Sequence, residues 1–388
     1  MVETKNNQSS RKQGGKNMCE KCVGKHDFVG SFLRPEELVQ ARQDFKDGKI
    51  DAAELKEVED KAITHLIEKQ KELGYEFITD GEFRRATWHL DFMWGFDGIE
   101  HHKTETGLPF ADEVALLDDT YLVGKLRFNE NHPFFDHLRF VQQFEDENHH
   151  AKLTNPAPAQ FLEQLIMPFA IENTSKYYDN QEEVVDDLVS VYRQFIQKAY
   201  DLGLRYLQLD DCSWGLLVDP RAQEFFGTDQ AGVDAIKQLF ADVNNRAIAD
   251  RPEDLVVNTH VCRGNFKSTY AASGSYEDVA EFLFAEEDVD SYFLEFDDDR
   301  SGGFEPLRKV SGDKQVVLGL ITSKKPQLED KERIIARIKE ASKYIPLERL
   351  SLSPQCGFAS TEDGNKLTEE DQWKKLQLVK EIADEVWG

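Results

Sequence analysis

The segment NTHVCRGNF, residues 258–266, places an imidazole and a thiol two positions apart, on His260 and Cys262. The pair ends an apolar, β-branched run, and residues i and i+2 of an extended chain point to the same side. Such a pair is either part of a metal site or an ordinary buried histidine beside a buried cysteine. The two residues alone do not decide between these interpretations.

Two later runs contain residues that could complete a metal site. Cys356 ends the segment RLSLSPQC, and Glu295 interrupts the otherwise apolar run SYFLEF. Taken singly, Cys356 reads as a small buried apolar side chain, and Glu295 reads as a strand end at the surface. Together with His260 and Cys262 they form a set of nitrogen, sulfur and oxygen donors that Zn²⁺ accepts in tetrahedral geometry.

This donor set favours sulfur chemistry. Two thiolates and one carboxylate outweigh the charge of Zn²⁺, which makes the ion a weaker activator of water. The same ion can hold a substrate thiol in its deprotonated form at neutral pH. Because a deprotonated sulfur is the nucleophile of alkyl transfer, the set predicts a zinc-dependent S-alkylation.

These residues need a scaffold that brings distant segments together. Short apolar runs predict strands at 27–31, 76–82, 151–158, 205–211, 255–262, 291–296, 315–321 and 349–356. Apolar residues that recur every three or four positions predict helices at 35–48, 52–74, 182–203, 232–250, 277–286, 330–345 and 368–387. This alternation predicts an α/β fold, a (β/α)8 TIM barrel, with a doubly wound open sheet as the alternative.

The domain boundaries follow from composition and from the lengths of the connections. Residues 1–23 are rich in Lys, Asn, Gln, Ser and Gly and are predicted to form a flexible tail, so the single barrel spans 24–388. The segment from about 97 to 150 exceeds a normal connection. It predicts a hairpin or other excursion built onto the barrel.

Polar residues fall at or just past the ends of six of the predicted strands. In a TIM barrel the carboxyl ends of all strands form one face, and active sites lie there. We therefore expect one cavity to be lined by Ser31, Glu82, Asp210, His260, Cys262, Glu295 and Cys356.

Bulk composition argues against several partners and locations. The 47 Lys and Arg against 74 Asp and Glu give a net charge of −27, which disfavours nucleic acid and membrane surfaces as partners. No stretch approaches the roughly 20 apolar residues that span a bilayer. The N-terminal segment lacks the apolar part of a secretory signal, so we expect a cytoplasmic protein.

The five cysteines, an odd number, favour free thiols over a disulfide framework. Cys19 and Cys22 form a CxxC pair in the polar tail, which we interpret as incidental. Cys212 follows two aspartates, and we interpret it as part of the cavity wall.

The ordered motifs resemble those of the C-terminal catalytic barrel of the cobalamin-independent methionine synthases. The matching motifs are VGSFLRP, TDGEFRR, LQLDD, THVC, LEFDDDRSG and LSPQCGF, and they extend over nearly the whole predicted barrel. The chain looks like the shorter, single-barrel relatives often labelled methionine synthase II, because the N-terminal half of the long enzymes has no counterpart in it.

The resemblance implies a zinc-dependent methyl transfer to homocysteine, from 5-methyltetrahydrofolate with or without a polyglutamate tail. By position in the motifs, it implies zinc binding by His260, Cys262, Glu295 and Cys356, contact with the homocysteine carboxylate by Ser31, and contact with its ammonium group by Glu82 and Asp210. The plainer alternatives are an ion pair of Glu82 with Arg84 or Arg85 and a helix cap for Asp210.

The predicted donor side departs from the family. Lys324 stands where the long enzymes have a histidine thought to assist proton delivery, and TNPAPAQF replaces their folate-side loop. Lys324, Asp211 or a water molecule could protonate the leaving nitrogen of a folate donor. Trp88 and Trp214 could stack on a pterin, or could simply pack in the core.

Other functions stay open at this point. The chain could transfer an alkyl group to another thiol of the coenzyme M type, or use a non-folate methyl donor. It could also be a non-enzymatic zinc or homocysteine sensor, or a decarboxylase on a similar barrel that needs no zinc thiolates. A requirement for an α-amino group, turnover and stoichiometric zinc would separate these functions.

Overall fold

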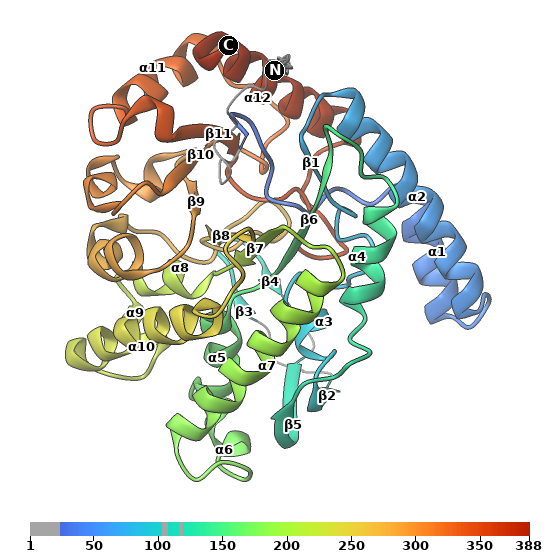
Figure 1. Cartoon of the computed structure of the whole chain (residues 1–388), viewed down its shortest axis with the longest axis vertical. Helices are drawn as coiled ribbons and strands as arrows, with labels where there is room; N and C mark the ends of the chain where they lie inside the picture. Colours follow the sequence, from blue (N-terminus) through green and yellow to red (C-terminus); the bar gives the residue numbers. More distant parts are fainter. Residues whose placement is uncertain (1–23, 103–107, 116–118) are drawn as a thin grey trace, which may run out of the picture.

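Seven parallel strands form a curled sheet at the centre of the molecule (Figure 1). The computed structural model describes residues 24–102, 108–115 and 119–388. In spatial order, the strands are β1 (Phe77–Ile78), β6 (His150–Pro156), β7 (Tyr206–Asp210), β8 (Val256–Val261), β9 (Ser291–Glu295), β10 (Gln315–Ile321) and β11 (Leu350–Pro354). The predicted α/β fold of the TIM-barrel type is confirmed.

The first predicted strand, 27–31, differs from the prediction because it forms no regular ladder. The segment still contacts both edges of the sheet: Asp27 N–H donates to the carbonyl of Leu352 at 3.1 Å, and Thr79 Oγ1 donates to the carbonyl of Gly30 at 3.0 Å. Between these points the backbone bonds to side chains instead. Phe28 N–H donates to Asp27 Oδ1 at 2.7 Å, and the Phe28 carbonyl accepts from Lys152 Nζ.

Helices surround the outer face of the sheet (Figure 1). The longer ones are α1 (Glu36–Lys46), α2 (Ala52–Glu72), α4 (Phe134–Gln142), α5 (Pro158–Ile166), α7 (Gln181–Asp201), α10 (Gln230–Ile248), α11 (Lys331–Ala341) and α12 (Glu369–Trp387). The shorter ones are α3 (Leu90–Met93), α6 (Ile171–Thr174), α8 (Ser213–Leu217) and α9 (Ala222–Phe225).

Two of the long helices begin at capping boxes. The Asp51 side chain accepts from the N–H of Glu54, whose carboxylate accepts from Asp51 N–H in return, at the start of α2. Thr368 and Asp371 make the same exchange at the start of α12. Each box satisfies backbone N–H groups that the first turn of a helix leaves unpaired.

The predicted helix 277–286 is wrong in type. That segment forms a 3₁₀ turn, Tyr276–Val279, followed by a π-helical turn, Glu281–Glu286. Two further 3₁₀ turns, Asp299–Ser301 and Glu305–Lys309, take the place of a helix between β9 and β10.

The predicted excursion between about 97 and 150 is confirmed. Strand β2 (Asp97–His102) pairs antiparallel with β5 (Asp119–Arg127), and β3 (Leu108–Pro109) pairs with β4 (Val114–Ala115). Helix α4 then leads back to the sheet at β6.

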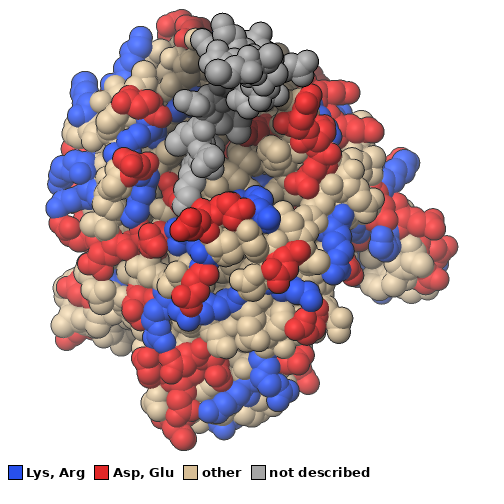
Figure 2. All heavy atoms as spheres, viewed as in Figure 1, with Lys and Arg blue, Asp and Glu red and all other residues tan. Residues whose placement is uncertain are grey.

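Charged side chains of both signs are interspersed over the face seen in Figure 2. Some join neighbouring helices, as Arg246 of α10 does with Glu182 of α7 at 3.0 Å. In the part of the chain that the structure describes, no helix combines the length and the apolar character needed to cross a bilayer. The predicted tail, with Cys19 and Cys22, lies outside the described residues.

Candidate metal centre and substrate cavity

A cavity opens at the carboxyl ends of the strands. Its wall includes side chains at or just past the ends of β7, β8 and β11, at the turn after β1, and on α5. The residues of the predicted site that line it are Ser31, Glu82, Trp88, Asp210, His260, Cys262 and Cys356. The lining also carries aromatic and aliphatic side chains: Phe110, Met167, Phe169, Leu216, Phe225 and Phe266.

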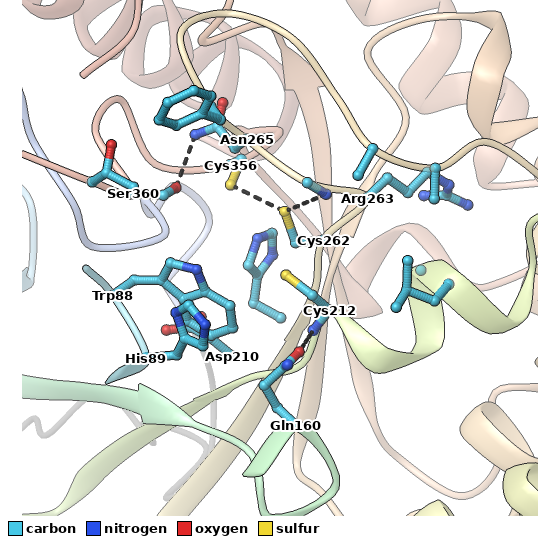
Figure 3. A pocket seen from close by; sticks show the side chains of 18 of the residues that line it. Trp88, His89, Gln160, Asp210, Cys212, Cys262, Arg263, Asn265, Cys356 and Ser360 are labelled. Carbon is cyan, nitrogen blue, oxygen red and sulfur yellow. Dashed lines mark hydrogen bonds between the residues drawn. The ribbon is translucent and has the colours of Figure 1, made fainter. Parts of the chain in front are cut away.

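Three of the four predicted zinc ligands converge in this cavity. One ligand atom from each of His260, Cys262 and Cys356 lies within 4.8 Å of the others, and all three residues are buried. The sulfur atoms of Cys262 and Cys356 are 3.6 Å apart, and both cysteines are free thiols. Figure 3 shows these two side chains turned toward one another, with Cys212 beside them.

The hydrogen bonding of His260 suits a metal ligand. Its Nδ1 lies 3.2 Å from the carbonyl oxygen of Phe293, which can only accept, so Nδ1 carries the hydrogen. In the neutral ring its Nε2 then presents a lone pair, and this buried atom has no hydrogen-bond partner among the described residues. A ligating histidine is commonly oriented by such a bond on its other ring nitrogen.

The thiols of Cys212, Cys262 and Cys356 influence one another's pKa values. Hydrogen bonds from Cys212 and Cys356 lower the pKa of Cys262 well below its ordinary value. The same sharing raises the pKa values of Cys212 and Cys356, since a second thiolate beside the first is disfavoured. Burial alone would lower the pKa of His260, but the neighbouring Cys262 raises it. Cys262 is therefore the thiol of the three that ionises most readily, and a bound cation would favour ionisation of both predicted ligands.

Glu295 lies near this group but outside it. Its Oε2 accepts from Arg300 Nη2 at 3.3 Å, whereas its buried Oε1 has no partner among the described residues. Burial, followed by the charge of Cys262, raises the pKa of Glu295 to about 7. The carboxylate is thus held by Arg300, and one of its oxygens stays unpaired.

The two acids predicted to contact the substrate ammonium group both line the cavity. Asp210 is 4% exposed, and its Oδ1 accepts from Gln208 Nε2 at 2.8 Å. Glu82 is 3% exposed; its Oε1 accepts from Thr154 Oγ1 at 3.0 Å and lies 3.4 Å from Arg85 Nη1. The ion pair considered for Glu82 is therefore present, but its Oε2 has no partner among the described residues.

The backbone near these residues is specialised. Glu82 has a φ of 61°, a conformation that costs energy for a residue with a side chain and often occurs at functional sites. Ser31 lies against Gly357, where an added Cβ would be 1.9 Å from Ser31 Oγ. Only glycine at 357 allows this close approach.

Three of the four predicted donor-side residues are not among the residues that line this cavity, and their predicted roles stay predictions. Trp214 is 0% exposed in the core, where its Nε1 donates to Glu287 at 3.0 Å. Asp211 points away from the cavity and accepts from Asn244 Nδ2 at 2.9 Å. Lys324 lies behind the wall, and its Nζ donates to Asn265 Oδ1 at 2.8 Å.

Trp88 is the donor-side residue that does line the cavity, stacked on His89 with ring centroids 4.5 Å apart. The sequence reasoning missed three polar residues of α5 in the same wall: Gln160, Glu163 and Gln164. Their spacing of three and four residues places them on one side of a helix, and this signal could have found them.

The chain is similar to known proteins over most of its length. The family described as "Cobalamin-independent synthase, Catalytic domain" matches residues 27–105 and 147–384, on either side of most of the excursion. YxjH of Bacillus subtilis, described as an uncharacterized protein, is 45% identical over 362 residues, covering 93% of this chain and 94% of that protein. A methionine synthase of Pyrococcus abyssi is 24% identical over 336 residues, covering 85% of each chain.

A solved structure is similar as well. The crystal structure of the putative vitamin-B12 independent methionine synthase from Listeria monocytogenes has a TM-score of 0.73 and 35% identity, covering 93% of this chain and 97% of that one. Its similarity extends over nearly the full length of both chains. The protein is therefore a methyltransferase that belongs to the cobalamin-independent methionine synthase family.

Proposed function

We propose that the protein makes methionine by transferring a methyl group to the sulfur of homocysteine. The observation that carries this proposal is the convergence of His260, Cys262 and Cys356 on one cavity, with the lone pair of His260 Nε2 unpaired. Such a donor set fits Zn²⁺. Glu295, with its unpaired Oε1, is the candidate fourth ligand. Bound zinc would hold the substrate thiol deprotonated at neutral pH.

The amino-acid part of the substrate would be fixed by polar groups of the same wall. Ser31 would contact the carboxylate of homocysteine, and the free oxygen of Glu82 together with Asp210 would receive its ammonium group. These contacts hold the substrate sulfur near the two cysteines. Because the sulfur is already positioned, less entropy is lost when it attacks the donor methyl group.

The proposed donor is 5-methyltetrahydrofolate. The apolar and aromatic lining, with Trp88 at the wall, supports a flat donor of this kind. The cytoplasm, where folate donors occur, is the proposed location.

The test is a methionine assay on purified protein combined with metal analysis. Zinc-loaded protein is incubated with homocysteine and with the mono- and triglutamate forms of methyltetrahydrofolate, and the same protein stripped by a chelator is the control. We expect methionine from the zinc-loaded protein and none after stripping. Turnover with another methyl donor but with no folate would discard the folate assignment and keep the transferase. Zinc binding without turnover on any donor would favour a sensor.

A further inference from the structure

Glu163 of α5 is a carboxyl group in the wall of the same cavity. It is 4% exposed. Its Oε2 accepts from Gln160 Nε2 at 3.3 Å, and no basic side chain bonds to it in the described part of the chain. A carboxylate buried in this way lacks the strong donors that stabilise a negative charge.

The orientation of the Gln160 side chain shows which of its atoms bonds to Glu163. Gln160 Oε1 accepts from the backbone N–H of Cys212 at 3.0 Å, a contact drawn in Figure 3. The amide nitrogen of Gln160 is therefore the end that faces Glu163. The partner of Glu163 is a neutral group, and its bond is long.

Two more buried acids lie behind Glu163, away from the cavity. Asp211 accepts from Ser213 N–H at 3.1 Å, from the Ser213 hydroxyl and from Asn244 Nδ2 at 2.9 Å. Glu287 accepts from Asn244 Nδ2 at 2.7 Å and from Trp214 Nε1 at 3.0 Å. Each of these acids has two or more hydrogen-bond donors.

Like charges in a buried group cannot all be ionised. Asp211 has the most donors and is the favoured site of the negative charge, whereas Glu163 has the fewest. Burial, followed by the charge of Asp211, raises the pKa of Glu163 to about 8. The other titratable groups of this cluster are the Cys212 thiol, the Tyr192 hydroxyl and Lys314, which lies on the far side of Glu287.

We propose that Glu163 is the general acid of the reaction and protonates the leaving nitrogen of the methyl donor. This inference rests on the proposed function. The homocysteine sulfur, whose proton has passed to solvent, forms a bond to the methyl carbon as the bond from that carbon to the donor nitrogen breaks. The electron pair of the broken bond stays on nitrogen, which takes the proton from the Glu163 carboxyl. Solvent then reprotonates Glu163.

The residues considered for this role from sequence are less suited. Lys324 lies outside the cavity wall, and its ammonium donates to Asn265 and Gly264. Asp211 is turned away from the cavity and is held by its own donors. Glu163 combines a neutral carboxyl group with a position in the wall. The inference also sets the class of donor, because a nitrogen leaving group requires a proton and a sulfonium or halide does not.

The test compares two methyl donors in the zinc-loaded Glu163→Gln variant. Methyltetrahydrofolate requires protonation of its leaving nitrogen, whereas iodomethane alkylates bound homocysteine without a proton donor. We expect the variant to lose about 10²-fold or more in kcat with methyltetrahydrofolate, the usual contribution of a general acid. Its rate with iodomethane should equal that of the wild type. The wild-type kcat should also fall as pH rises through about 8, and this decline should be absent in the variant.

Glu287→Gln is the matched control. It makes the same carboxyl-to-amide change in the same cluster but outside the cavity, so kcat with methyltetrahydrofolate should be retained. Equal losses with both donors, or an unchanged kcat in Glu163→Gln, would overturn the role of Glu163 and leave the proposed function in place. Failure of the wild type to use methyltetrahydrofolate, with iodomethane still accepted, would instead reject the folate donor and this inference with it.

Discussion

Replacing Asp210 by asparagine should weaken homocysteine binding and, at the same time, stabilise the metal-free protein above neutral pH. Asp210 is 4% exposed, and burial raises its pKa to about 7 from an ordinary value of 3.8. The folded protein therefore holds this proton more tightly than the unfolded chain does. Stability that is fully present below pH 3.8 is lost as pH rises through about 7.

The size of both effects follows from the structure. At 1.36 kcal/mol per pKa unit, the shift from 3.8 to about 7 corresponds to up to about 4 kcal/mol of lost stability at pH 8. Asparagine avoids this loss, and its side-chain oxygen can still accept from Gln208 Nε2. It also removes a charged hydrogen bond to the substrate ammonium group, which costs about 1–3 kcal/mol, or about 5- to 150-fold in Kd.

Two measurements check this prediction. Calorimetric titration of the zinc-loaded protein with homocysteine gives the change in Kd, and denaturant unfolding of the metal-free protein at pH 5 and pH 8 gives the change in stability. Asp313→Asn, an exposed change in the loop before β10, is the control and should alter neither quantity. An unchanged Kd would move the ammonium contact to another residue. A stability gain that is the same at both pH values would show that Asp210 does not take up a proton on folding.

Four further substitutions test the metal and substrate contacts. Cys262→Ser or Cys356→Ser should lose zinc and methyl transfer while circular dichroism still reports a folded barrel; a variant that keeps both would remove that residue from the ligand set. Glu295→Gln should weaken zinc binding in a chelator competition assay, if the carboxylate completes the site, by at least the about 10- to 100-fold that loss of a residue supporting a ligand costs. An unchanged zinc affinity would limit the ligands to the other three. Gly357→Ala should raise KM for homocysteine with zinc retained, because the added methyl group displaces Ser31; an unaltered KM would argue against the Ser31 contact.

The cavity could be predicted from sequence because the fold itself gathers the strand ends. Asp210, His260 and Cys356 are far apart along the chain, yet each lies at or just past the end of a parallel strand. Recognising the strands was therefore enough to bring these residues to one face. The motif spacing carried no such information about their neighbours. Glu295 contacts Arg300, five residues later, because of the path of a 3₁₀ turn. The spacing of apolar residues does not predict that turn.

Three of the predicted donor-side residues do not line the cavity, and the alternation of side chains explains part of this difference. Successive residues of an extended strand point to opposite sides. With Asp210 in the cavity, Asp211 had to point toward the helices, where Asn244 of α10 binds it. Trp214, at the start of α8, likewise packs into the core beside Glu287. Glu163 was overlooked because no helix was predicted over 158–166, and because a glutamate is usually exposed unless packing such as that of α5 buries it.

The charges of the acids and thiols in the cavity wall determine which ligands the site favours. The cavity wall carries Glu82, Asp210 and Glu163, all buried and all with raised pKa values. Beside them lie thiols, of which Cys262 has a lowered pKa. Such a wall favours ligands that bring positive charge, because each one allows an acid to ionise without a buried net charge. On the proposed function, a metal ion and the substrate ammonium group are those ligands. They would satisfy the thiols, Glu82 and Asp210. Glu163, which no proposed cation contacts, would keep its proton until the methyl group is transferred.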